Sequence, residues 1–209
     1  LKLVSLTRDQ VLFVTGQSPD HAYFLVGAII SMMRDMPDGS SVETHMLGRS
    51  GMVGTGIGTT GVASFYRARV RSSGLAYKMD VQALRNVWGH CPALARNIQK
   101  SIQQILIQLA QAIVCGKKHS IEQQLIRWIL LTLDNTLTDT ISITHQELSD
   151  LLCVRREAVS LAMRRLAEAG WVSNSRGVIT VLDLIVLFLA WHEYGLVGRE
   201  LKCRLDRSP

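Results

Sequence analysis

The sequence predicts an α+β protein in which an N-terminal β jelly roll is followed by a long helix and a C-terminal winged helix-turn-helix. Three observations predict this order: short β-prone runs with Gly turns up to about residue 79, a heptad-spaced helical stretch after them, and two short helical patterns with a β-prone pair near the end. We therefore expect a jelly roll at 1–91, a dimerisation helix at 92–116 and a winged helix-turn-helix with a C-terminal helix at 117–209.

Turn signals divide the N-terminal part into short strands. Pro37-Asp38-Gly39 is a strong turn, and Met52 to Gly61 is rich in Gly and Thr. The Gly-rich stretch lacks the Gly-Lys-Ser/Thr of a P-loop, so turn glycines explain it better than a phosphate cradle. Arg67, Arg69 and Arg71 alternate and share one face of a strand, which either lines an anionic pocket or is solvated.

A helical stretch from Ala93 to about Val114 carries apolar residues at spacings of four, three, four and three. This is the a/d pattern of a two-chain coiled coil, and it favours a homodimer over a helix buried in a single chain. Gly116, with the two lysines that follow it, predicts a hinge-like break in the helix. The predicted dimer seam is Ile98, Ile102, Ile105, Leu109 and Ala112.

Residues 143–166 predict a helix, a turn and a second helix. Thr144 and Glu147 form a capping box, and Cys153-Val154 is the turn. The second helix, predicted from Arg155, directs apolar residues inward and Arg155, Arg156, Glu157, Ser160 and Arg164 outward. Such a face suits a DNA major groove, because Arg bonds guanine edges and Glu accepts from the cytosine amine.

Two β-prone runs, 171–174 and 178–181, surround a predicted hairpin turn at Ser175-Arg176-Gly177. With the two helices they make a winged helix. An ordinary helical hairpin with a solvated charged face is the plain alternative, and the capping box, the Arg-Arg-Glu start and the wing favour nucleic-acid binding over it.

Composition sets outer limits on function. The net charge of +6 suits a polyanion, but residues 117–209 carry 12 Lys or Arg against 11 Asp or Glu, so the DNA assignment depends on the motif. No apolar run is long enough for a membrane span, no signal peptide is visible, and the four widely spaced cysteines fit free thiols in the cytoplasm rather than a metal site. The chain begins at Leu1, and we expect that some N-terminal sequence precedes it. No catalytic constellation is visible, so we do not expect an enzyme.

The chain resembles the Crp–Fnr family of bacterial transcription regulators. The resemblance is carried by I-T-H-Q-E-L at 143–148, R-R-E-A-V at 155–159 and H-S-I-E-Q-Q-L-I-R-W at 119–128. It implies a jelly-roll sensor domain, a homodimer that reads a palindromic operator in double-stranded DNA, and RNA polymerase as a candidate partner.

Carried over by position, the resemblance makes Arg156 and Glu157 base-reading residues, with Arg155 and Ser160 beside them. A second base-reading Arg of the cyclic-AMP-responsive branch falls at Leu161, so that branch's operator is not expected here. The residues expected to contact phosphates are Thr144, His145, Gln146, Ser173, Ser175 and Arg176.

The resemblance also places an effector pocket at Thr55, Tyr66 and Arg67. Thr55 replaces a family Glu that holds the ribose, and Tyr66-Arg67 stands where an Arg-Ser pair holds the cyclic phosphate. We therefore expect an unidentified small-molecule effector rather than cyclic AMP. The four-cysteine cluster of the iron–sulfur branch is absent, no residue argues for haem, and we identify no cofactor.

A second hypothesis is a winged helix that docks proteins and no longer reads DNA. Salt dependence separates the two, since DNA binding loses roughly 0.9 log units of affinity per log unit of salt for each phosphate neutralised.

Overall fold

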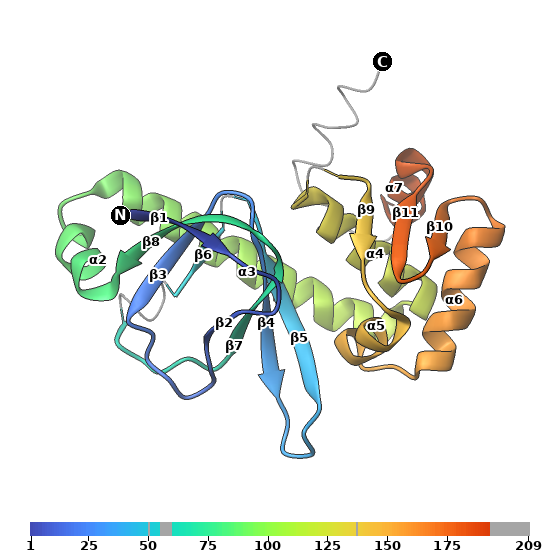
Figure 1. The fold of residues 1–209 in the computed structure, drawn as a ribbon, viewed down its shortest axis with the longest axis horizontal. Helices are drawn as coiled ribbons and strands as arrows, with labels where there is room; N and C mark the ends of the chain where they lie inside the picture. Colours follow the sequence, from blue (N-terminus) through green and yellow to red (C-terminus); the bar gives the residue numbers. More distant parts are fainter. Residues whose placement is uncertain (50, 55–59, 137, 193–209) are drawn as a thin grey trace. The chain divides into compact units, whose positions relative to one another are not determined.

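The structure, a computed structural model, describes residues 1–49, 51–54, 60–136 and 138–192. The chain divides into two compact units, Leu1–Ala112 and Ile113–Pro209. Figure 1 shows strands and two helices, α2 (Val81–Trp88) and the start of α3 (Pro92–Lys118), in the first unit, and a small helical domain with three strands in the second. The α+β class and the predicted order of jelly roll, long helix and winged helix are confirmed.

Two four-stranded antiparallel sheets make the jelly roll. Their strand orders are β1-β8-β3-β6 and β2-β7-β4-β5. Both orders mix strands from distant parts of the chain, so long-range pairing holds the roll together. The strands are β1 (Lys2–Leu6), β2 (Val11–Phe13), β3 (His21–Leu25), β4 (Ile29–Asp35), β5 (Ser41–Leu47), β6 (Met52–Val53), β7 (Arg67–Ser72) and β8 (Gly74–Asp80).

One core fills the space between the two sheets. Strand β7 shows how it is built, because Ala68 and Val70 are fully buried in it while the alternating arginines of the strand face the other way. Both sheets, and Ala28 between β3 and β4, supply the buried residues of this core, which are Leu6, Phe13, Tyr23, Leu25, Ala28, Ile30, Met32, Leu47, Val53, Ala68, Val70 and Ala76.

Helices α2 and α3 close the other face of the first sheet. The Asp80 side chain accepts from the Ala83 amide at 3.0 Å and fixes the start of α2. Leu84 of α2 and Ile98 of α3 are then buried against Ala22 of β3. The sheet is therefore covered on both faces, and α3 begins as part of the chain's own core.

The predicted break at Gly116 is wrong. Helix α3 continues through Gly116 and ends at Lys118. A glycine inside a helix costs only about 0.5–1 kcal/mol relative to Ala, which neighbouring helical residues can offset. Lys117 and Lys118 lie in the last turn, where positive charge is favoured by the helix dipole.

The second unit is a winged helix-turn-helix. Its sheet has the order β10-β11-β9, and β9 is a strand that the sequence did not predict. Strand β9 has only three residues, which is too short for a recognisable β pattern in the sequence. Its pairing with β11 defines it as a strand. The elements are α4 (Ile121–Asp134), β9 (Thr140–Ser142), α5 (His145–Leu152), α6 (Arg156–Glu168), β10 (Val172–Ser175), β11 (Val178–Val181) and α7 (Leu184–His192).

A buried histidine lies on β5. His45 is 6 % exposed, and its Nδ1 lies 3.0 Å from the Thr44 hydroxyl. That hydroxyl donates to the Met32 carbonyl at 2.9 Å, so its oxygen accepts from Nδ1–H of His45. The ring packs edge-on against Tyr66. Burial lowers the pKa of His45 to about 4, and the ring is neutral at pH 7.

Acid should destabilise the jelly roll through His45. An unfolded histidine has a pKa near 6.5, so below that pH the unfolded chain binds a proton that the folded chain excludes. The free energy of unfolding should therefore fall by roughly 3 kcal/mol as the pH drops from 7 to about 4, where His45 titrates in the fold. Denaturant titrations at the two pH values measure this loss. The variant His45→Gln should lose distinctly less stability over the same range, and an equal loss would contradict the assignment.

Candidate nucleic-acid interface

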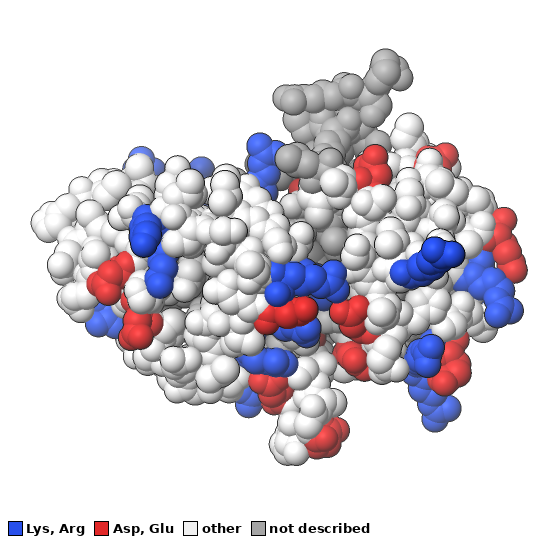
Figure 2. Space-filling model, in the orientation of Figure 1, with Lys and Arg blue, Asp and Glu red and all other residues white. Residues whose placement is uncertain are grey.

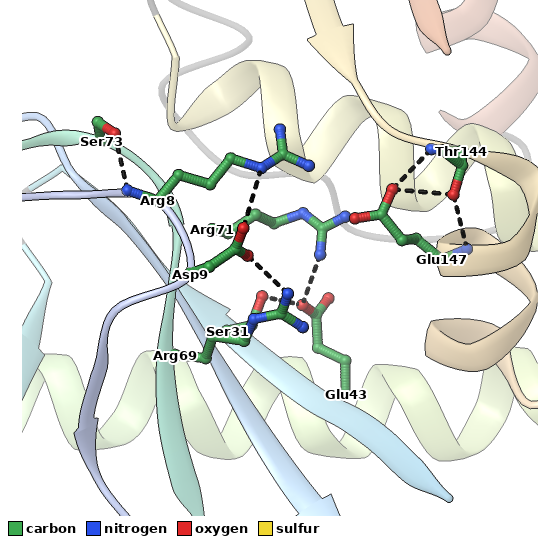
Figure 3. Close-up of polar contacts among 9 residues, drawn as sticks. All are labelled: Arg8, Asp9, Ser31, Glu43, Arg69, Arg71, Ser73, Thr144 and Glu147. Atoms are coloured by element: carbon green, nitrogen blue, oxygen red, sulfur yellow. Dashed lines mark hydrogen bonds and ion pairs between the residues drawn. The ribbon is translucent and has the colours of Figure 1, made fainter.

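A capping box fixes the start of α5. The Glu147 amide donates to the Thr144 hydroxyl at 3.1 Å, and the Thr144 amide donates to Oε2 of Glu147 at 2.8 Å (Figure 3). The Thr144 hydroxyl also donates to that carboxylate at 2.9 Å. Thr144 was predicted to contact phosphate, and the structure places its polar groups on Glu147 instead, where they hold the helix end.

The turn between α5 and α6 needs a left-handed residue. Cys153 has φ 53° and ψ 44°, and both its amide and that of Val154 donate to the Ser149 carbonyl. This confirms the predicted turn. A residue with a Cβ pays about 1–2 kcal/mol in this backbone region, which glycine visits freely.

Replacing Cys153 by glycine should stabilise the second unit. Relief of the left-handed strain outweighs the extra entropy of glycine in the unfolded chain by about 0.5–1 kcal/mol. Denaturant titration of Cys153→Gly measures the gain. Cys153→Ala, which keeps the Cβ, should leave stability near that of the original chain, and an equal gain in both variants would show that strain is not the cause.

Helix α6 has one buried and one exposed face. Val159, Met163 and Leu166 are buried in the second unit, whereas Arg156 and Glu157 are exposed. The helix begins at Arg156, so Arg155 is its N-cap rather than its first residue, and the Arg155 side chain makes no capping hydrogen bond.

The start of α6 opposes the usual preferences of a helix N-terminus. The N-cap favours Ser, Thr, Asp or Asn, and the positive end of the helix dipole favours acidic side chains. Arg155 and Arg156 instead place two exposed guanidinium groups there, and Glu157 is the acidic side chain of the first turn. Such a choice costs stability, of order 1 kcal/mol in total, and local choices of this kind concentrate at functional sites.

His145 connects three elements of the winged helix. Its Nδ1 lies 2.9 Å from the Ser160 hydroxyl of α6, and its Nε2 lies 2.6 Å from Nδ2 of Asn174 on β10. His145 was predicted as a phosphate contact and Ser160 as a base reader, and the structure brings them together. Asn174 was not predicted, because nothing in the sequence relates position 174 to position 145.

The protonation of His145 determines what Ser160 can do. Desolvation and the nearby charge of Arg156 lower the pKa of His145, so the ring is neutral at pH 7. The Asn174 amide donates to Nε2, which places the ring proton on Nδ1 facing Ser160. The Ser160 oxygen then accepts from His145 and keeps its own hydroxyl hydrogen for another acceptor.

The wing presents three of the predicted residues to solvent. Ser173 and Ser175 alternate with buried or half-buried residues on β10, and both are exposed. Arg176 and Gly177 form a two-residue hairpin turn with φ 49° and 76°, a combination typical of a type I′ turn. Figure 1 shows β10 beside α6. Gln146, also exposed, donates to Asp150 of its own helix at 2.8 Å.

Charge is distributed in small groups. On the face shown in Figure 2, blue Lys and Arg side chains alternate with red Asp and Glu side chains over both units. Arg165 of α6 pairs with Glu122 of α4, so it differs from Arg156 on the same helix. The face in Figure 2 has no broad positive surface, so the start of α6 is singled out by its local geometry.

Two of the three predicted effector residues, Tyr66 and Arg67, point in different directions. Thr55 lies outside the described residues. Tyr66 packs against the jelly-roll core, whereas Arg67 faces away from it and pairs with Asp35 at 2.8 Å. Arg67 therefore does not line the interior with Tyr66.

The other two alternating arginines of β7 also have carboxylate partners. Arg69 pairs with Asp9 at 2.6 Å, and Arg71 lies 3.8 Å from Glu43, which also accepts from Ser31 (Figure 3). Carboxylates therefore neutralise the arginines on this face of β7, and the pairing argues against a pocket for anions there. Within the described ranges, no group of three or more His, Cys, Asp or Glu side chains could hold a metal ion.

The predicted dimer seam divides between two faces of α3. Ile98 is fully buried in its own unit and Ile105 packs against the jelly-roll core, so these two serve the chain's own interior. Ile102 is 41 % exposed, Leu106 54 % and Ile113 61 %. The exposed residues, with the half-buried Leu109, again have spacings of four, three and four. We call Ile102, Leu106, Leu109 and Ile113 the α3 stripe.

Sequence families match both units. Residues 3–90 match the cyclic nucleotide-binding domain family, and residues 123–187 match the Crp-like helix-turn-helix domain family. Fold and site together define a helix-turn-helix transcription regulator with a cyclic-nucleotide-binding-type domain. The chain belongs to the Crp–Fnr family. No curated protein matches it in sequence.

Solved structures share the fold at low identity. A CRP-family regulator from Thermus thermophilus has a TM-score of 0.74 at 18 % identity over 90 % of this chain and 96 % of its own. A CRP/FNR-family regulator from the same organism gives 0.75 at 19 % over 93 % and 100 %. FixK2 from Bradyrhizobium japonicum gives 0.73 at 13 % over 94 % and 98 %. None of the described helices is both long and apolar enough to cross a membrane.

Proposed function

We propose that this regulator binds a palindromic operator sequence-specifically as a homodimer, and that its jelly roll responds to a small-molecule effector. The observation that carries the proposal is the start of α6, where Arg155, Arg156 and Glu157 are exposed while the opposite helix face is buried. In this proposal the protein is a bacterial regulator that binds DNA in the cytoplasm and catalyses no reaction.

The geometry supports a division of labour in the major groove. Arg156 can bond O6 and N7 of guanine together, and Glu157 can accept from the cytosine amine. Ser160 keeps a hydroxyl hydrogen for a base or phosphate acceptor. Exposed Ser173, Ser175 and Arg176 of the wing are suited to backbone phosphates, which position the protein without reading sequence.

Replacing Arg156 should weaken specific binding. Arg156→Ala should cost about 1–3 kcal/mol at the preferred site and relax its preference at one base pair, because a bidentate contact is lost. The measurement is selection from random DNA by the full chain, followed by affinity measurements on the selected site and on scrambled DNA across a range of salt.

Arg165→Ala is the matched control, since it removes the same charge from the same helix but from a side chain that pairs with Glu122. It should keep the base preference. Equal losses on selected and scrambled DNA in Arg156→Ala would make Arg156 a phosphate contact. No enriched sequence, or affinity independent of salt, would favour the protein-docking hypothesis instead.

The α3 stripe supports the homodimer. Monomeric proteins rarely leave a continuous apolar stripe of this kind in water, and its spacing is that of a coiled-coil seam. The stripe keeps Ile102 and Leu109 of the predicted seam and adds Leu106 and Ile113. It leaves out the half-buried Ala112, and it leaves out Ile98 and Ile105 because the jelly roll already covers them. A second copy of this chain carries a stripe with the same spacing, so two α3 helices can pair through their stripes.

A charge in the stripe should separate the dimer. Leu106→Asp buries an unpaired carboxylate between two helices, so the protein should sediment as a monomer at concentrations where the original chain is a dimer. Gln104→Asp is the matched control, because it adds the same charge to an exposed residue on the opposite side of α3. A dimer that survives Leu106→Asp would place the interface elsewhere.

The effector that we propose is a small molecule other than cyclic AMP. The replacement of the family's ribose and phosphate residues, together with the pairing of Arg67 with Asp35, favours an effector other than cyclic AMP. RNA polymerase is a further partner that we propose from the family, for any promoter that the protein activates.

A further inference from the structure

Helix α6 has one large apolar side chain on its exposed side, Leu161, and the proposed function gives it no contact. Leu161 is 48 % exposed, whereas the other large apolar side chains of α6, Val159, Met163 and Leu166, are buried. A single exposed leucine is common on protein surfaces, so its exposure alone says little. Its place on the helix is the informative part.

Leu161 lies at the edge of the face that we assign to DNA. It follows Glu157 by four residues and precedes Arg164 by three, and side chains at these spacings are neighbours on a helix. Leu161 is therefore a neighbour of Glu157 and Arg164, and it lies opposite the buried face. Helical side chains also lean toward the N-terminus, which directs Leu161 toward the turn that carries Glu157.

The chemistry of this position selects a base. In the major groove the thymine methyl is the one apolar feature among the edges of the four bases, and apolar side chains contact it. A branched, uncharged side chain can gain nothing from a guanine or adenine acceptor and leaves a cytosine amine unsatisfied. We infer that Leu161 is a specificity-determining residue that selects thymine by packing on its methyl group. This inference rests on the proposed function.

The expected effect is modest and measurable. One methyl group removed from apolar contact corresponds to about a fourfold change in affinity. Replacing thymine by uracil in DNA removes this methyl and leaves the hydrogen-bonding edge unchanged. A uracil scan therefore tests the contact without disturbing the base pair.

The experiment uses the full chain and the operator obtained by selection from random DNA. Each thymine of one half-site is replaced singly by uracil, and affinities are measured for the original protein, for Leu161→Ala and for Leu189→Ala. Leu189→Ala is the matched control, because Leu189 is also exposed, at 58 %, but lies on α7.

We expect one thymine position at which uracil weakens the original protein and Leu189→Ala about fourfold. Leu161→Ala should bind the thymine and uracil forms of that site equally. If uracil affects all three proteins in parallel at every position, the inference is wrong while specific binding, and with it the proposed function, stands. If the original protein selects no sequence at all, the proposed function fails and the inference fails with it.

Discussion

The burial of one face of α6 is the constraint on which the DNA-reading unit depends. Val159, Met163 and Leu166 are buried between α4, α5 and the wing, and this fixes the rotation of the helix about its axis. Because helical side chains follow each other at about 100° per residue, that rotation also decides which residues reach solvent. The face with Arg156 and Glu157 is exposed as a consequence of the core, and the half-buried Ser160 lies at its margin.

Some local features around this helix lower the stability of the second unit, and others raise it. The left-handed Cys153 and the two arginines at the start of α6 are unfavourable locally. The capping box of α5, the hydrogen bonds of His145 to Ser160 and Asn174, and the type I′ turn of the wing hold the same region in position. The result is a rigid base for side chains that are themselves free of the core.

Helix α3 meets two demands with one sequence. One side packs against the jelly roll through Ile98 and Ile105, and another leaves the α3 stripe exposed. A heptad pattern read from sequence contains both sides, because apolar residues for a chain's own core and for a partner obey the same helical period. The structure separates them by showing which residues the sheets already cover.

The sequence by itself determined the order of the domains, the helix start at Thr144, the hairpin turn at Arg176-Gly177 and the exposed start of α6. These features depend on residues close together in the chain, where capping, turn chemistry and helical period act directly. Only the tertiary structure decided the carboxylate partners of Arg67, Arg69 and Arg71, the link from His145 to Asn174, the short strand β9 and the α3 stripe. Each of these depends on strand register or on packing between distant segments, and no local pattern in a single sequence specifies which distant residues will meet.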